Sequence, residues 1–118
     1  MRILKVEPSQ VTYEKDIPNT LESIQAEVGG GLFQPLYIGS GIILCCNEEG
    51  KLNGMKPNRR LGNDIVCGPF FLVGDSESGD FVSLTDDQLA WGMETFAEPE
   101  QFTGEEPELE PWMEFYVW

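Results

Sequence analysis

Residues 32–46 read Leu-Phe-Gln-Pro-Leu-Tyr-Ile-Gly-Ser-Gly-Ile-Ile-Leu-Cys-Cys, and this stretch decides the fold class of the chain. It contains two runs of β-forming residues, 32–38 and 42–46, separated by a short glycine loop, which is the pattern of a β-hairpin. The second run is apolar at every position. It therefore predicts a central strand that is buried on both faces.

Further strands are predicted on both sides of this hairpin. Strand-forming residues recur at 2–6, between Val11 and Ile17, from about Asp64 to Val73, and at Phe81-Val82. Pro69 interrupts the third of these segments, because proline lacks a backbone donor and is confined to edges and bulges. Residues 51–64 are polar and contain Pro57, so we predict an irregular loop there.

A first helix is predicted to begin at Asn19, with this residue as the N-cap and Glu22 three positions later. Its apolar face consists of Leu21, Ile24 and Val28. Three glycines at 29–31 end the helix. Glycines that cradle a phosphate precede a helix, whereas these follow one, so a C-cap and turn is the favoured interpretation.

A second helix is predicted to begin at Thr85, which forms a capping box with Gln88. Its apolar face is expected to consist of Leu89, Met93 and Phe96. Pro99 forces an end nearby. Gly92 lies inside this helix, where glycine costs about 1 kcal/mol relative to alanine.

These elements predict an α+β fold in one domain, residues 1–97, with a mostly antiparallel sheet of four to six strands and two helices packed on it. Residues 98–118 follow as an acidic, proline- and glutamate-rich arm that ends in the aromatic segment 112–118. The arm is expected to be extended. Its aromatic end is too apolar to face water, so it docks either on its own domain, the favoured alternative, or on a partner.

Charge is divided unevenly along the chain. All seven basic residues lie at or before Arg60, and the net charge is −14. The second half therefore carries only negative charge, which repels nucleic acid and anionic membranes and attracts basic protein surfaces. We expect a basic protein or ribonucleoprotein as partner, with no direct binding of nucleic acid or membrane.

The composition argues against catalysis. The chain contains no histidine, which removes the usual nucleophile pairs and the imidazole general base. Its three cysteines form no CxxC pair, and no nucleotide-binding fingerprint precedes a helix. We therefore predict a protein that is not an enzyme and needs no metal or cofactor. The N-terminus has no apolar signal region and no apolar run is long enough to cross a membrane, which predicts a cytoplasmic protein.

One polar loop concentrates candidate ligand-binding groups. Four of the seven basic residues fall within residues 51–60. One interpretation is an anion or carboxylate clamp that would serve a nucleotide or metabolite; its candidate residues are Asn47, Lys51, Asn53, Asn58 and Arg59. The other is a structural loop in which Arg59 pairs with an acidic neighbour. The structural interpretation is favoured.

Several segments in collinear order resemble a known family. They are Cys-Asn-Glu-Glu-Gly-Lys-Leu-Asn-Gly-Met-Lys-Pro-Asn-Arg at 46–59, Asp-Ile-Val-Cys-Gly-Pro-Phe-Phe-Leu-Val-Gly at 64–74 and Asp-Phe-Val-Ser-Leu-Thr-Asp-Asp-Gln at 80–88. Over residues 4–88 the chain resembles the domain of unknown function 3846. This resemblance implies a setting in bacteriophages, plasmids and integrative elements, and it implies no activity or site.

Charge and setting together predict an acidic protein that occupies the basic groove of a host defence complex in the bacterial cytoplasm, as an anti-CRISPR or antirestriction protein. The candidate partner-binding residues are Asp86, Asp87, Glu94, Glu98, Glu105, Glu106, Trp112, Phe115, Tyr116 and Trp118. The alternatives are a small-ligand module that uses the residue 47–60 loop and a regulator of the element's own replication proteins. The acidic charge could also serve solubility alone.

Overall fold

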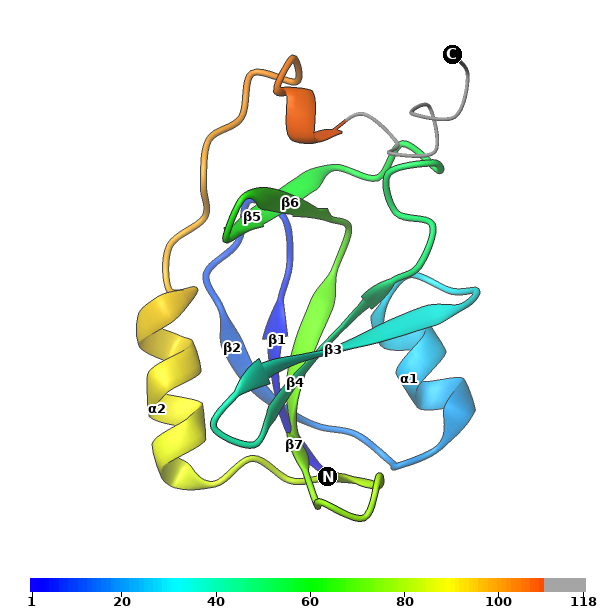
Figure 1. Cartoon of the computed structure of the whole chain (residues 1–118), viewed down its shortest axis with the longest axis vertical. Helices are drawn as coiled ribbons and strands as arrows, with labels where there is room; N and C mark the ends of the chain where they lie inside the picture. The colour runs from blue at the N-terminus through cyan, green and yellow to red at the C-terminus, as the bar shows by residue number, and fades with distance from the viewer. Residues whose placement is uncertain (110–118) are drawn as a thin grey trace.

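The structure is a computed structural model that describes residues 1–109 as one α+β domain (Figure 1). Its elements, in chain order, are β1 (Arg2–Val6), β2 (Tyr13–Asp16), α1 (Leu21–Glu27), β3 (Phe33–Gly39), β4 (Ile42–Asn47), β5 (Pro57–Leu61), β6 (Asp64–Cys67), β7 (Phe70–Asp75), β8 (Phe81–Val82), α2 (Asp86–Thr95) and the 3₁₀ turn η1 (Pro107–Leu109). The predicted fold class is confirmed.

The main sheet is antiparallel and has the strand order β2-β1-β7-β4-β3, with β8 paired to the end of β7. As predicted, β4 is central, because β7 and β3 flank it. Leu4, Leu72 and Leu44 lie side by side in register across β1, β7 and β4. All three are fully buried, so this row of leucines forms the middle of the core.

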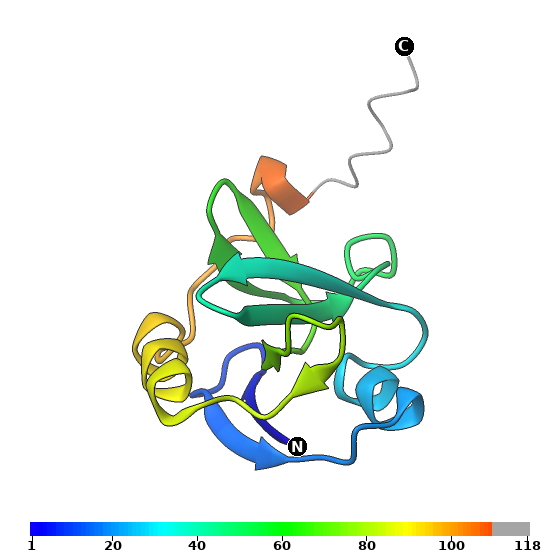
Figure 2. The ribbon, with the colours of Figure 1, turned by 60° about the horizontal axis from the view of Figure 1, so that its bottom comes forward.

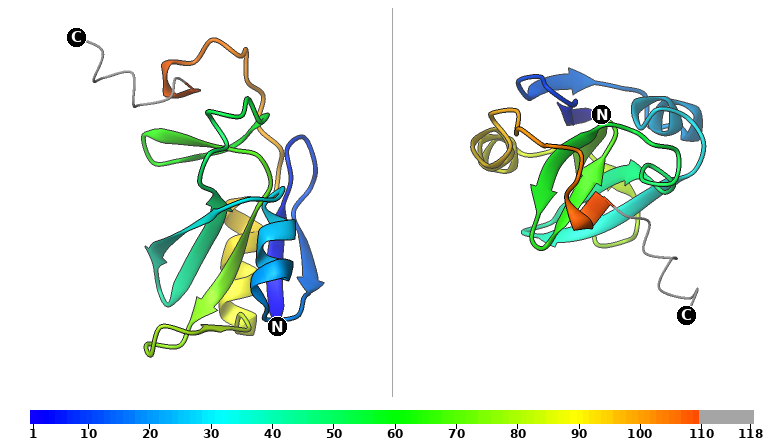
Figure 3. Two further views of the ribbon diagram at one scale, coloured as in Figure 1. Left: turned by 90° about the vertical axis from the view of Figure 1, so that its right-hand side faces the viewer. Right: turned by 90° about the horizontal axis from the view of Figure 1, so that it is seen from above.

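The two helices cover opposite faces of the main sheet, as Figures 2 and 3 show. Phe70 and Phe71 are adjacent on β7 and belong to separate core clusters, because successive strand residues point to opposite faces. The cluster around Phe70 includes Leu84 and Phe96, which flank α2 in the sequence. The cluster around Phe71 includes Ile24 of α1. Both faces of β7 are therefore covered.

The prediction of an irregular loop at 51–64 is wrong for its second half. Strands β5 and β6 form a separate antiparallel hairpin, and Pro69 separates β6 from β7. The turn between them consists of Gly62 and Asn63, and Gly62 has a φ of 60°, which glycine adopts readily. A two-residue Gly-Asn turn is a hairpin signal, but the polar residues of this segment and Pro57 favoured a loop.

The start of α1 differs from the prediction by one residue. Thr20 is the N-cap, and its hydroxyl accepts a hydrogen bond from the Ser23 backbone. Asn19 instead donates to the Phe81 carbonyl, which ties the α1 entry to β8. Leu21, predicted on the apolar face, is exposed, whereas Ile24 and Val28 are buried.

Helix α2 begins as predicted. Thr85 and Gln88 form the complete capping box, and the Gln88 side chain also donates to the carbonyls of Ser40 and Gly41. The predicted apolar face is wrong at Met93, which is exposed. Gly92 is buried in its place.

Gly92 is a close-approach glycine rather than a weak point. A Cβ atom built there would lie 2.6 Å from Leu4 Cδ2 and 2.8 Å from Leu72 Cδ1. We expect Gly92→Ala to destabilise the domain by about 1–2 kcal/mol, because overpacking outweighs the gain in helix propensity. Urea unfolding measures this, with Glu94→Ala on the exposed face of α2 as the matched control. A stabilised Gly92→Ala variant would contradict this account of the packing.

Beyond α2 the chain crosses the β5–β6 hairpin and does not extend freely through residue 109. The Glu100 carboxylate accepts a hydrogen bond from the Arg60 backbone at 2.8 Å, and the Arg60 guanidinium lies 5.8 Å from the Phe102 ring centre. Arg60 also lies 3.7 Å from the Glu108 carboxylate. Arg60 thus contacts residues 98–109 at three points. The predicted docking of segment 112–118 lies outside the described residues.

Candidate functional site

Helix α2 carries three of the predicted partner-binding residues. Asp86 and Asp87 occupy its first turn, where carboxylates are favoured by the helix dipole. Asp86 forms an ion pair with Arg2 at 2.9 Å, although its side chain is 92% exposed. Asp87 and Glu94 are exposed and form no ion pair within residues 1–109. The outer face of α2 is therefore negatively charged.

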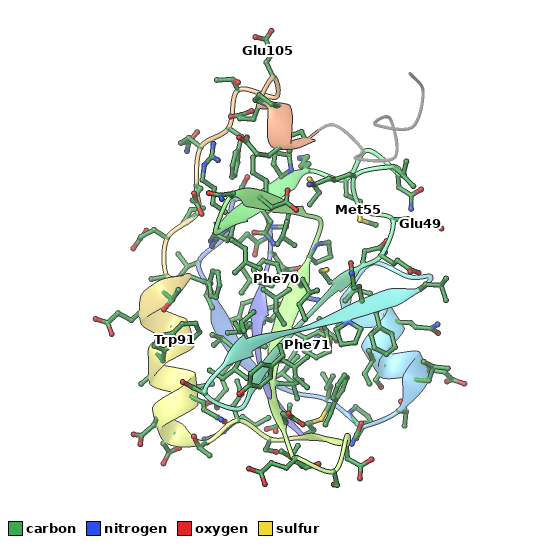
Figure 4. All side chains as sticks on the ribbon, viewed as in Figure 1. Glu49, Met55, Phe70, Phe71, Trp91 and Glu105 are labelled. Carbon is green, nitrogen blue, oxygen red and sulfur yellow. The ribbon has the colours of Figure 1, made fainter. Side chains whose placement is uncertain are left out.

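The segment after α2 continues this acidic surface. Glu98 and Glu105 are exposed, and Glu105 lies at the end of the molecule farthest from the start of α2 (Figure 4). Glu106 has a structural role, because its carboxylate accepts hydrogen bonds from the backbones of Thr103 and Gly104. These hydrogen bonds to the charged form lower the pKa of Glu106. Glu106 thus holds the turn that presents Glu105.

Trp91 is a functional candidate that the sequence prediction missed. It is 43% exposed on the outer side of α2, between Asp87 and Glu94 at helical spacing. Its ring packs edge to face against Phe96, with centres 6.3 Å apart, so it is held in place. A fixed, half-exposed tryptophan flanked by carboxylates is typical of an interface anchor. The exposed face of the capped helix could have identified it. We call Asp87, Trp91, Glu94, Glu98 and Glu105 the acidic edge.

The basic residues do not offset this charge on the surface. Five of the seven form ion pairs with carboxylates within the domain. One of them, Lys5, is buried and pairs with Glu27 at 2.8 Å. Arg59 is buried as well. Lys56 alone has neither an ion pair nor burial within residues 1–109. The outer surface therefore carries most of the net negative charge.

Two residues of the predicted anion clamp point into the protein interior. Arg59 is 1% exposed, and its guanidinium donates to carbonyls of Gln10 at 2.7 Å, Asn58 at 3.2 Å and Phe96 at 3.3 Å. Burial lowers the pKa of Arg59, and the charges of Glu100 and Glu98 oppose that shift. Asn58 is also buried and donates to the carbonyls of Val6 and Gly68.

Arg59 therefore fastens backbone segments together, as the structural interpretation of the loop requires. Its partners differ from those expected. They are carbonyls and the Asn58 side chain, and no carboxylate of residues 1–109 pairs with it. The predicted ion pair with an acidic neighbour is wrong, because the neighbouring chain turns its backbone oxygens toward the guanidinium.

Asn47 and Lys51, two of the three other candidates, line a cavity of about 180 Å³ between the β3–β4 and β5–β6 hairpins. Asn47 is committed to structure, since its amide donates to the carbonyls of Val28 and Gly30. Lys51 forms an ion pair with Asp64. Asn53 is exposed and does not line the cavity. The five predicted residues thus do not converge on one anion.

The three cysteines are free and buried. Burial raises the pKa of the Cys45 thiol to about 12 and that of Cys46 to about 11, and it also raises the pKa of Cys67. The thiols are therefore protonated at neutral pH and pack as small apolar groups. Within residues 1–109, no cluster of three or more histidine, cysteine or acidic side chains could hold a metal ion.

The fold and this surface describe a small acidic α+β domain. Residues 1–98 match the family described as Domain of unknown function (DUF3846), so the chain belongs to that family. No curated protein and no solved structure matches the chain.

No helix within residues 1–109 has both the length and the apolar character needed to span a membrane. The aromatic candidates Trp112, Phe115, Tyr116 and Trp118 lie outside the described residues.

Proposed function

We propose that this protein is a non-enzymatic inhibitor of a bacterial defence complex that binds nucleic acid, such as a CRISPR effector or a restriction enzyme. It acts in the cytoplasm of the cell that carries the mobile element. Its acidic edge occupies a basic groove in place of DNA or RNA.

One observation carries this proposal: within residues 1–109 every basic side chain except Lys56 is paired or buried, while acidic ones on α2 and residues 98–105 face outward. Asp87, Glu94 and Glu98 are exposed and form no ion pair within residues 1–109. Capped α2 holds Asp87 and Glu94 on ordered backbone, and the Glu106 turn does the same for Glu105. A fixed row of negative charges competes with a phosphate backbone for the same lysines and arginines.

Trp91 adds an anchor that charge alone does not provide. Exposed carboxylates contribute mainly to encounter rate and to salt dependence, whereas buried aromatic anchors dominate affinity. The packing of Trp91 on Phe96 preorganises this anchor. The capture of a nucleotide by the residue 47–60 loop has weaker support, because Arg59 is buried and Lys51 is neutralised by Asp64.

The test is expression of the full chain in bacteria that each carry one restriction or CRISPR system, followed by plating of a phage which that system blocks. We expect plating to recover for the inhibited system. The triple variant Asp87→Asn/Glu94→Gln/Glu98→Gln is expected to bind the purified target at least about tenfold more weakly, because each lost charge contact is worth roughly 0.5–1 kcal/mol. Trp91→Ala is expected to cost about 2 kcal/mol or more of binding.

The matched control is Asp16→Asn/Glu22→Gln/Glu49→Gln, which changes the net charge equally at exposed positions outside the acidic edge. It is expected to retain inhibition. If both triple variants lost inhibition equally, inhibition would depend on the net charge of the protein rather than on the acidic edge. Failure to restore plating for any system would count against the proposed function itself.

A further inference from the structure

The cavity between the two hairpins has apolar walls contributed by separate segments of the chain. Leu36 comes from β3, Leu52 from the turn after β4, Leu61 from β5 and Val66 from β6. The Cys46 and Cys67 side chains also line it, and both thiols are protonated. At about 180 Å³, the cavity is close to the roughly 150 Å³ that accommodates a benzene-sized molecule in an apolar site.

The rim of this cavity is polar and carries a net negative charge. Glu48, Lys51 and Asp64 line it, so two carboxylates and one ammonium group leave a net charge of −1. The Lys51 ammonium is already paired with Asp64. Glu48 is exposed and forms no ion pair within residues 1–109. Within residues 1–109, the rim therefore offers the unpaired Glu48 carboxylate and no unpaired cation.

The net negative charge of the rim is opposite in sign to the charge that an anion clamp requires. An anionic ligand would have to separate Lys51 from Asp64 and approach Glu48 as well. A cationic ligand gains from both carboxylates and from the net charge of −14 on the whole chain. A group that carries a positive head on a compact apolar body would place the body against the leucines and the head at the rim.

We propose that this cavity binds a small primary amine, in which an ammonium group is attached to an aromatic or branched aliphatic body of about seven or eight carbon atoms. The ammonium donates hydrogen bonds to Asp64 and Glu48 at the rim. The body fills the space between Leu36, Leu61 and Val66. This site is separate from the acidic edge and does not depend on the function proposed for it.

The experiment uses three probes of one shape and different charge: benzylamine, benzyl alcohol and benzoate. Each is titrated into the full chain labelled at its methyl groups, and chemical-shift changes are followed by NMR. Benzylamine is expected to shift the methyl signals of Leu36, Leu61 and Val66, with a dissociation constant of about a millimolar for so small a ligand. Benzoate is expected to bind at least roughly threefold more weakly.

Asp64→Asn provides the decisive variant. The exposed Asp64 side chain also accepts a hydrogen bond from the Ile65 backbone, which asparagine retains, so the fold is preserved. The substitution releases Lys51, and we expect benzylamine to bind roughly two- to fivefold more weakly and benzoate more tightly. The control Glu77→Gln removes an exposed charge from a residue that does not line the cavity and is expected to change neither affinity.

Three results would overturn the proposal. They are benzoate affinity equal to that of benzylamine in the natural protein, probe affinities unaffected by Asp64→Asn, and methyl shifts confined to residues outside the cavity. A second variant, Leu36→Phe, fills the cavity and is expected to abolish the shifts at Val66. Leu32→Phe, at an exposed position next to β3, is its matched control. Undiminished binding by Leu36→Phe would place the amine elsewhere.

Discussion

Arg59→Met is expected to destabilise the domain by about 3–5 kcal/mol, which is a large share of the stability of a domain this size. The guanidinium is 1% exposed and donates to carbonyls of Gln10, Asn58 and Phe96. Methionine fills similar space but leaves the Gln10 carbonyl and the Asn58 side-chain oxygen without the donor they have in the natural protein. The Phe96 carbonyl keeps its hydrogen bond from the Thr12 hydroxyl. Each buried unsatisfied acceptor costs about 1–3 kcal/mol. Urea unfolding at neutral pH measures the loss.

Arg60→Met is the matched control, since Arg60 is the next residue along β5 and is exposed. The Arg60 side chain is 46% exposed and its contact with the buried Glu108 carboxylate oxygen is long, at 3.7 Å, so we expect a loss of only about 1 kcal/mol. Arg59→Lys is expected to recover little, because a single ammonium cannot reach three carbonyls in different directions. If the Arg59 and Arg60 variants lost equal stability, the guanidinium would not be fastening the backbone segments.

The contacts of Arg59 could not be predicted from the sequence. The hairpin at 33–47, the capped start of α2 and the central place of β4 follow from local patterns, because turn residues and apolar runs act over a few positions. The partners of Arg59 come from Gln10 and Phe96, far away in the sequence. No local pattern encodes such a contact. A buried arginine and an exposed one look the same in a polar stretch.

The role of Gly92 also depends on packing contacts with residues far away in the sequence. Helix propensity identifies it correctly as an unfavourable residue, but the compensation lies in Leu4 and Leu72 of two distant strands. Of the candidate site, the charges of α2 could be predicted because a capping box fixes which residues form the helix. The structural role of Glu106 could not, since it depends on a turn without a strong sequence signal.

Glu27, the last residue of α1, joins two lysines and is the other residue with a large expected effect. Its carboxylate accepts from Lys5 at 2.8 Å and from Lys15 at 2.8 Å. The Lys5 side chain is only 6% exposed. Glu27→Gln would leave that ammonium buried without a counter-charge, and breaking one side of a buried ion pair costs about 3–5 kcal/mol. Unfolding in urea near pH 7 measures the effect, with the exposed Glu22→Gln on the same helix as control.

The same carboxylate makes stability depend on pH in a predictable direction. Burial opposes ionisation of Glu27, but the hydrogen bonds and charges of Lys15 and Lys5 prevail and hold its pKa below the ordinary 4.5. A carboxyl group whose pKa is lowered by folding stabilises the protein above its unfolded pKa. That contribution is lost as the pH falls through the lower folded value. The difference in unfolding free energy between the natural protein and Glu27→Gln is therefore expected to be constant from pH 7 to about pH 5 and to shrink below about pH 4.5.

Comparing variants at each pH separates this effect from the general relief of repulsion when a chain of net charge −14 is protonated. The relief is common to the natural protein, Glu27→Gln and Glu22→Gln, so it cancels in the difference. Adding Lys5→Met to Glu27→Gln removes the buried charge itself and is expected to restore part of the lost stability at pH 7. Two results would mean that Lys5 does not depend on the Glu27 charge. One is a loss of unfolding free energy in Glu27→Gln that stays the same from pH 7 to pH 3. The other is a double variant that is less stable than Glu27→Gln.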